Sequence, residues 1–360
     1  MAEVIKTTIK ALRANHGDAI VVEITKDSGE IFRILIDGGP PGMIAQTNHP
    51  VLKAQQTREF LQLLNEYRDK CLEFDITVLT HIDSDHIGGL LAAYRREEYR
   101  KVIGKNLWFN SPSLVSKKLN IAQPPNSNII ISPIAGVNTS VREAVDLDDL
   151  VELYQPNRLL ITTSTPPMIL DWGRIDILSP TVSQLIDLVD YWEAEIADKT
   201  TSGKKNDYEN TIEHYQKNDS FTSDTSVRNG SSIAMLVRSS VSSILLLADS
   251  FSTTVASSLR NLGYSETNKL KIDVCKISHH GSKGNTCTEL LSLINCKFFI
   301  ISTNGGKQLP NKQTIARILS VFPAAQFIFN YPELTKKIFN EEELKTYAYN
   351  ISNLKEIILP

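Results

Sequence analysis

Two histidines and two aspartates lie within six residues of the sequence, in the run His81-Ile-Asp83-Ser-Asp85-His86. Imidazole nitrogens and carboxylate oxygens are common protein ligands of divalent metals. The preceding run, 74–80, is apolar and β-branched and predicts a buried strand, so His81 falls where that strand ends. His81 and Asp83 would point the same way along an extended chain, while Asp85 and His86 would lie on the following turn. We therefore predict four metal ligands at one strand end.

The same loop has a simpler interpretation. Asp and Ser residues between a strand and a helix often cap the helix. Here Gly88-Gly89 would turn the chain tightly into the apolar run 90–94, which has helix-forming composition. Capping requires only one such side chain, however, and this loop offers two histidines as well as two aspartates, which favours a metal site.

Two later predicted strands also end in residues that can bind metal. Asp249 follows the apolar run 243–248, where a buried carboxylate is costly unless a cation receives it. His279 and His280 follow the run 272–277. Alternatively, Asp249 could cap the next helix, and the two histidines could form a structural pair. Three strands that end in His or Asp favour one cluster at a sheet edge.

The composition limits what the rest of the chain can do. Of 360 residues, 41% are hydrophobic and 22% charged, as in a soluble globular protein. The formal net charge of −3 gives no basic field for nucleic acid or a membrane, so an anionic substrate must be held locally. No apolar run approaches the roughly 20 residues of a membrane helix, and we expect no membrane partner. The four cysteines lack C-x-x-C spacing and the N-terminus lacks a signal-peptide core, which favours a reduced, cytoplasmic protein.

The remaining patterns predict one domain, residues 1–360, that opens with antiparallel strands and continues with alternating strands and helices. Further strands are expected at 5–12, 20–24, 31–36, 107–109, 159–162, 172–180 (a turn into a strand), 233–238 and 297–302, and helices at 51–67, 141–153, 181–197, 253–262 and 312–322. Residues 198–228 are rich in Lys, Asn, Asp, Ser and Thr, so we expect an exposed, mobile insertion there.

The run H-I-D-S-D-H-I-G-G resembles the first metal-binding motif of the metallo-β-lactamase superfamily, H-x-[HD]-x-D-H, in the variant with Asp in third place. Further short motifs follow the order found in the branch that includes the hydrolase domain of the competence protein ComEC. They are N-H-G-D-A at 15–19, L-I-D-G-G at 35–39, N-G-S-S at 229–232, L-A-D at 247–249 and S-H-H-G-S at 278–282. The resemblance covers essentially the whole chain. It implies an α/β (α+β) fold, an αββα sandwich of two mixed sheets with helices outside and a dinuclear metal site at one edge.

The resemblance also implies roles for individual residues. His81 and Asp83 would hold one metal, Asp85 and His86 the other, and Asp249 would bridge both. His279 would complete the second set, with His280 beside it as a further ligand or as a proton donor. Because adjacent residues of an extended strand point to opposite sides, only one of the pair faces the metals unless the backbone turns between them. On this interpretation His279 is the ligand and His280 lies on the substrate side.

The sequence departs from the family at one position. The superfamily usually supplies a further histidine between the first motif and the bridging aspartate, and His214 is the only histidine in that interval. It lies in the polar segment, where a solvated side chain is the simpler interpretation. A carboxylate at Asp83 in place of an imidazole makes the first site harder, which favours Mn²⁺ or Mg²⁺ over Zn²⁺. We expect two divalent ions, manganese or zinc with magnesium possible.

The resemblance favours a metal-dependent phosphodiesterase or nuclease that acts on DNA or another phosphodiester. Such ions activate water and neutralise charge on the scissile phosphate, and Asp85 could orient the attacking water. Lys283 and Asn304, in glycine-containing loops, could hydrogen-bond phosphate oxygens, although ordinary loop polarity explains them equally well. Two alternatives stay open at this point: a hydrolase of a lactam, lactone or thioester, and a regulatory module with a protein partner and a partly occupied site.

Overall fold

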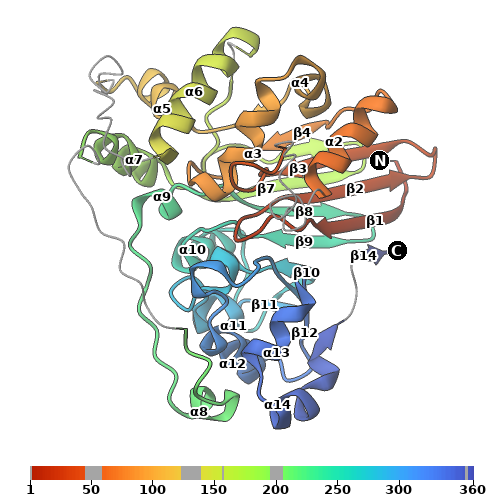
Figure 1. Cartoon of the computed structure of the whole chain (residues 1–360), viewed down its shortest axis with the longest axis vertical. Helices are drawn as coiled ribbons and strands as arrows, with labels where there is room; N and C mark the ends of the chain where they lie inside the picture. Colours follow the sequence, from red (N-terminus) through yellow and green to blue (C-terminus); the bar gives the residue numbers. More distant parts are fainter. Residues whose placement is uncertain (1, 45–58, 123–138, 156–157, 195–205, 353–355) are drawn as a thin grey trace, which may run out of the picture.

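Two mixed β-sheets lie face to face at the centre of the molecule, and helices cover their outer sides (Figure 1). This computed structural model describes residues 2–44, 59–122, 139–155, 158–194, 206–352 and 356–360. The first sheet has the order β14 (Ile357–Leu359), β1 (Val4–Ala11), β2 (Ile20–Lys26), β3 (Ile31–Ile36), β4 (Ile76–Val78), β5 (Leu107–Trp108). The second has the order β13 (Ile351–Ser352), β12 (Gln326–Phe329), β11 (Ile294–Ile301), β10 (Leu270–Lys276), β9 (Ser243–Leu246), β8 (Ala234–Ser239), β7 (Gly173–Ser179), β6 (Met168–Leu170).

The direction of the strands determines where their ends meet. Strands β1 to β3 pair antiparallel, as the alternating N-terminal pattern predicts, and β4 then pairs parallel to β3. In the second sheet, β9 to β13 are all parallel, and β6 to β9 are antiparallel. Because β9 and β10 are parallel neighbours, the residues that follow them leave the sheet at the same edge.

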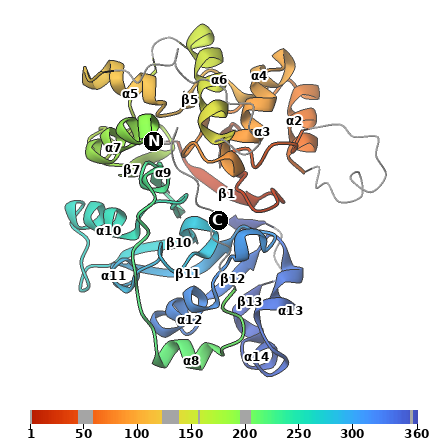
Figure 2. The same ribbon diagram turned by 60° about the vertical axis from the view of Figure 1, so that its left-hand side comes forward.

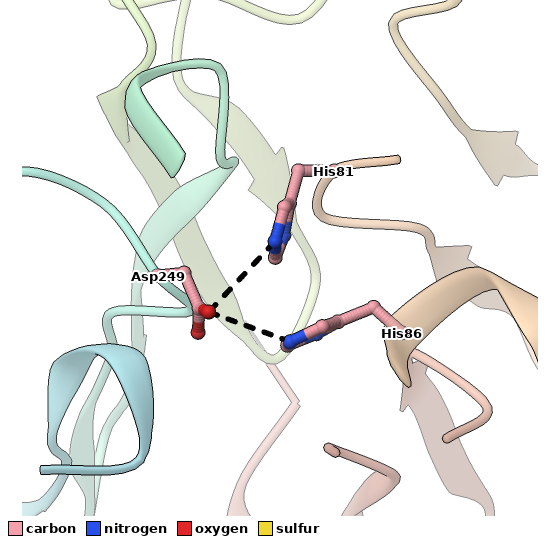
Figure 3. A group of neighbouring side chains, drawn as sticks. All are labelled: His81, His86 and Asp249. Carbon is pink, nitrogen blue, oxygen red and sulfur yellow. Dashed lines mark ion pairs between the residues drawn. The ribbon is translucent and has the colours of Figure 1, made fainter. Parts of the chain in front are cut away.

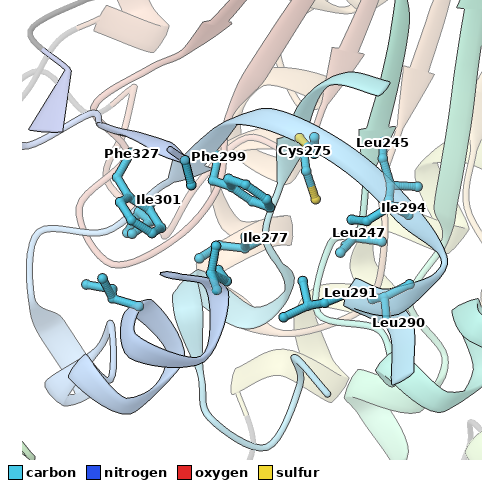
Figure 4. Packing of buried hydrophobic residues seen from close by; sticks show 14 of the residues in the cluster. Leu245, Leu247, Cys275, Ile277, Leu290, Leu291, Ile294, Phe299, Ile301 and Phe327 are labelled. Atoms are coloured by element: carbon cyan, nitrogen blue, oxygen red, sulfur yellow. The ribbon is translucent and has the colours of Figure 1, made fainter. Parts of the chain in front are cut away.

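Both faces of the central strands are buried, which explains their continuous apolar sequences. Along β9, Ile244 and Leu246 point into the core between the sheets, whereas Leu245 and Leu247 point to the helices outside. The outer cluster of the second sheet continues through Cys275 and the residues labelled in Figure 4. Because successive side chains of a strand point to opposite faces, one apolar run contributes both to the core between the sheets and to the core under the outer helices.

Helices form the two outer layers. The first sheet is covered by α2 (Glu59–Asp69), α3 (Ser84–Tyr94), α4 (Glu97–Ile103) and α6 (Thr139–Tyr154). The second is covered by α10 (Ser252–Asn261), α11 (Thr288–Ser292), α12 (Lys312–Val321) and α13 (Thr335–Ile338). Helices α5 (Pro112–Leu119) and α7 (Val182–Ala194) pack together at one end of the molecule, and α14 (Glu341–Thr346) contacts α13. The predicted two-sheet α/β sandwich is confirmed at this level. Within the described residues, no helix has the length and apolar character of a membrane span.

Two local predictions are wrong. Residues 159–162 form no strand, because the backbone N–H and C=O of Ile161 pair with the side-chain amide of Asn110 at 2.9 and 2.7 Å instead. Gly88 and Gly89 do not turn the chain into the helix, because α3 already begins at Ser84. A Cβ on Gly89 would lie 1.9 Å from the carbonyl oxygen of Gly38, so the glycine permits close packing of α3 on the loop after β3. The part of the predicted helix at 51–58 lies outside the described residues.

The described part of the polar segment, residues 206–228, is held to the second sheet's helices. Its helix α8 (Ile212–Lys217) packs on α12 through Ile212, which is fully buried. Asp207 accepts hydrogen bonds from two backbone N–H groups at the start of α12. Arg317 pairs with Asp219 at 2.7 Å. The chain then returns to α9 (Val227–Gly230), which lies beside α7 (Figure 2). There the side-chain amide of Asn229 lies 3.2 Å from the Nδ1 of His279, just after β10. Hydrogen bonds and an ion pair thus hold a segment whose composition offers little apolar area to bury. The mobility of the segment stays a prediction.

We expect Arg317→Ala to make residues 206–228 several times more susceptible to limited proteolysis. The Arg317 guanidinium also donates to the carbonyls of Ser220 and Thr286, and hydrogen bonds of charged groups contribute about 1.5–3 kcal/mol each. Cleavage of native protein follows the population of the locally open form. Mass spectrometry of the first fragments measures the rate, and Arg260→Ala, at an exposed pair, is the control. Equal rates in all three proteins would contradict this anchoring role.

Candidate metal centre

Seven side chains at one edge of the sandwich, which we call the His/Asp cluster, come from three strand ends. His81 and Asp83 follow β4, Asp85 and His86 lie in the first turn of α3, Asp249 follows β9, and His279 and His280 follow β10. Figure 3 shows His81, His86 and Asp249 converging from the two sheets. The structure thus brings together all six predicted metal ligands and His280.

The Asp249 carboxylate is the centre of this cluster. Its Oδ2 lies 3.5 Å from the Nε2 of His86, 3.7 Å from that of His279, and 3.8 Å from those of His81 and His280. The side chain is buried. It does not cap α10, whose N-cap is Phe251 without a side-chain hydrogen bond. The capping alternative for Asp249 is therefore wrong.

The spacing of the donor atoms matches two adjoining ligand sets. Around one position, His81 Nε2 lies 3.9 Å from Asp83 Oδ2 and 3.8 Å from Asp249 Oδ2. Around the other, His280 Nε2 lies 3.8 Å from both Asp85 Oδ2 and Asp249 Oδ2, with His86 alongside. Four ligands at about 2.1 Å from a tetrahedral metal lie about 3.4 Å from one another. The observed separations are close to that value.

Three imidazoles present an unpaired nitrogen to the cluster. Their Nδ1 atoms are fixed by Thr80 Oγ1 (His81, 3.0 Å), Asp37 Oδ2 (His86, 2.8 Å) and the carbonyl of Ser302 (His280, 2.8 Å). Each Nε2 is buried and has no hydrogen-bond partner. In a neutral ring these contacts place the proton on Nδ1 and leave the lone pair of Nε2 for a ligand. A divalent metal fits these residues, because it would bind three buried nitrogen atoms that have no hydrogen-bond partner among the described residues.

Two loops that precede β2 and follow β3 support the ligands from behind. Asp37 accepts hydrogen bonds from the backbone N–H and the hydroxyl of Thr80, each at 2.8 Å, while holding His86. Gly17 lets its loop approach α3, since a Cβ there would lie 1.7 Å from the carbonyl oxygen of Asp85. The next residue, Asp18, pairs with the buried Lys276 behind the cluster.

The charges of the cluster are strongly coupled. Burial and the neighbouring His86 lower the pKa of His81 well below its ordinary value, so this imidazole is neutral. Burial alone would lower the pKa of His86, but Asp249 and Asp37 raise it well above its ordinary value. A metal bound at His86 Nε2 must therefore displace a proton, which predicts weaker metal binding as the pH falls.

The adjacent pair His279 and His280 turns between its two side chains. Both residues are in the left-handed region, with φ of 48° and 54°, so both imidazoles can approach Asp249. The side chain of His280 is 1% exposed, whereas that of His279 is 23% exposed and its Nδ1 contacts Asn285 and Asp224. This geometry favours His280 as the ligand and His279 as the residue facing the substrate, the reverse of the order expected from an extended chain.

The two polar residues predicted to bind substrate do not contact the cluster within the described part of the chain. Lys283 is exposed, and the Oδ1 of Asn304 accepts a hydrogen bond from the N–H of Gly306 within its own loop. Two other cations contact the cluster instead. Lys307 Nζ lies 2.8 Å from Asp85 Oδ2, and Arg228 Nη1 lies 3.1 Å from Asp83 Oδ1.

His214 does not supply the third imidazole of the first metal position. It is exposed on α8, where its ring packs against Tyr215 at a centroid distance of 5.4 Å. Among the described residues, Asp83 forms ion pairs with His81 and with Arg228, and no further imidazole contacts it. The supporting residues Asp18, Asp37 and Lys276 were also not predicted as functional. Asp37 follows the apolar strand β3, so the strand-end pattern that identified Asp249 could have identified it.

Comparison with protein-family models gives no match to this sequence, and no curated protein matches it either.

Proposed function

We propose that this protein is a metal-dependent hydrolase of phosphodiester bonds, with a fold of the metallo-β-lactamase type. The observation that carries the proposal is the set of three buried, unpartnered Nε2 atoms around the Asp249 carboxylate. Buried polar atoms are rarely left unsatisfied, and three imidazoles directed at one carboxylate oxygen form a typical metal-binding arrangement.

The cluster has enough donors for two divalent ions. His81, Asp83 and Asp249 would hold one, and Asp85, His86, His280 and Asp249 the other. Bound divalent ions would lower the pKa of water and neutralise charge on a phosphate. The mixture of carboxylates and imidazoles suits Mn²⁺ as well as Zn²⁺.

The cations beside the cluster favour an anionic substrate over a neutral lactam or lactone. Lys307 and Arg228 each contact a cluster carboxylate, and both side chains are partly exposed. They concentrate positive charge where a phosphate would enter, although the whole chain is acidic. A nucleic-acid backbone, and DNA in particular, is the class of substrate that we propose.

On this proposal, His279 would hold a proton on the substrate side. Burial lowers its pKa, but Asp249 and Asp224 outweigh this effect and raise it to about 9, so the ring is protonated at neutral pH. Its Nδ1 is oriented by Asp224 and Asn285, while its Nε2 faces the cluster. In this arrangement Nε2–H can donate a proton to the leaving oxygen. Asp85, whose Oδ2 lies 3.8 Å from the Nε2 of His280, would accept a hydrogen bond from the attacking water.

The test is hydrolysis of bis(p-nitrophenyl) phosphate and of single-stranded DNA by purified protein of known metal content. We expect cleavage with Mn²⁺, loss of cleavage with EDTA, and recovery when Mn²⁺ is returned. A chromogenic lactam and a lactone serve as the neutral comparison substrates. If the purified protein contains no metal and shows no activity with Mn²⁺, Mg²⁺ or Zn²⁺, the proposed hydrolase function is wrong. Metal binding without hydrolysis of any substrate would instead support a regulatory module.

A further inference from the structure

The ammonium group of Lys307 contacts a proposed metal ligand directly. Its Nζ lies 2.8 Å from the Oδ2 of Asp85, the same oxygen that lies 3.8 Å from the unpartnered Nε2 of His280. The Asp85 carboxylate is 4% exposed, and a buried carboxylate requires a cation or several donors. Lys307 therefore supplies charge where a divalent ion would supply it.

The backbone of Lys307 is fixed, whereas its side chain enters from solvent. The residue has a φ of 53° in the short helix η3 (Gly306–Gln308), which follows β11. A Cβ on Gly306 would lie 2.7 Å from that of His16, so the loop packs tightly on the loop before β2. The Lys307 side chain is nevertheless 50% exposed. Its ammonium can thus leave Asp85 by side-chain rotation alone.

Among the described residues, three cations near the cluster differ in how exposed their side chains are. The side chain of Lys276 is 1% exposed and pairs with Asp18, so it cannot exchange its partner without unfolding. That of Arg228 is 28% exposed and holds Asp83. Lys307 is the most exposed of these three, and it contacts the oxygen that the second ligand set requires. Cations that compete for one carboxylate oxygen weaken each other's binding.

We propose that Lys307 is an exchangeable cation of the site, which neutralises Asp85 until a divalent ion displaces it and then binds a phosphate group of the substrate. The proposal rests on the metal site of the proposed function. It adds a residue outside the ligand sets that binds an anionic phosphate oxygen of the substrate, and a role for that residue in the metal-free protein. One side chain would thereby serve both the metal-free and the substrate-bound protein.

The first test is the affinity for Mn²⁺ alone, measured by titration without substrate. Lys307→Ala should bind Mn²⁺ about tenfold more tightly than the wild type, because a competing positive charge is removed. The matched control is Lys337→Ala, which makes the same change in net charge at an exposed residue beside the same loop. An unchanged or weaker affinity in Lys307→Ala, with an unfolding temperature like that of the wild type, would overturn the proposal.

The second test is binding of inorganic phosphate to the Mn²⁺-loaded proteins. Lys307→Ala should bind phosphate about tenfold more weakly, since one charged hydrogen bond is lost, and Lys337→Ala should bind it as the wild type does. Equal phosphate affinities would refute the substrate-binding part. Both measurements are independent of turnover. If both affinities change as expected while no phosphodiester is cleaved, the proposed hydrolase activity is wrong and the role of Lys307 holds. If phosphodiesters are cleaved and neither affinity changes, the hydrolase activity holds and the role of Lys307 is wrong.

Discussion

Asp249→Asn is expected to abolish metal-dependent hydrolysis and to remove the thermal stabilisation that Mn²⁺ gives. One oxygen of this carboxylate faces four imidazoles, so the substitution removes a ligand from both proposed metal positions at once. The loss in metal affinity should exceed the about 10- to 100-fold that is typical when a residue only orients a ligand. An ion at 100 times its Kd stabilises a protein by about 2.7 kcal/mol, which this variant should lack.

The fold should survive the substitution, because Asn has the shape of Asp and keeps a polar group at the strand end. Unfolding curves with and without Mn²⁺ measure both effects. The matched control is Asp176→Asn, at another buried acid, which pairs with Arg174 and Arg238. The control should unfold at a lower temperature and still gain stability from Mn²⁺. If Asp249→Asn keeps wild-type turnover or the full gain from Mn²⁺, the bridging role is wrong.

His280→Ala should lose bound metal, whereas the neighbouring His279→Ala should keep metal and lose turnover. The Nε2 of His280 is buried and unpartnered, and its Nδ1 is held by the carbonyl of Ser302. Removing it should weaken metal binding about 100-fold or more. His279 is partly exposed and oriented by Asp224, and loss of a general acid typically lowers the rate by about 10²- to 10⁴-fold.

The two substitutions control for each other, since they make the same chemical change at adjacent positions. Metal content after dialysis distinguishes the ligand, and turnover at saturating Mn²⁺ distinguishes the proton donor. Loss of metal from His279→Ala alone would restore the order predicted for an extended chain. Loss from both would make both histidines ligands and leave the proton donor unassigned.

The sequence by itself determined the main strands and the residue types that follow them. An apolar run such as 243–248 predicts a strand buried on both faces, and the polar residue that follows it must leave the sheet at its edge. This reasoning placed His81, Asp249 and His279 at strand ends, where the structure has them. It succeeded because periodicity and the end of an apolar run are local properties of the chain.

Only the tertiary structure decided which further residues meet these ligands. Lys307 and Asp85 are 222 residues apart in the sequence, and Lys276 and Asp18 are 258 apart, so no local pattern relates them. Sequence reasoning predicted Lys283 and Asn304 as the substrate-binding residues instead. The turn that brings both His279 and His280 to Asp249 depends on a left-handed backbone at two histidines, which local preference disfavours. Contacts with distant segments override that preference, because the N–H of His279 donates to the carbonyl of Ala248 at 2.8 Å and the Nδ1 of His280 donates to the carbonyl of Ser302 at 2.8 Å.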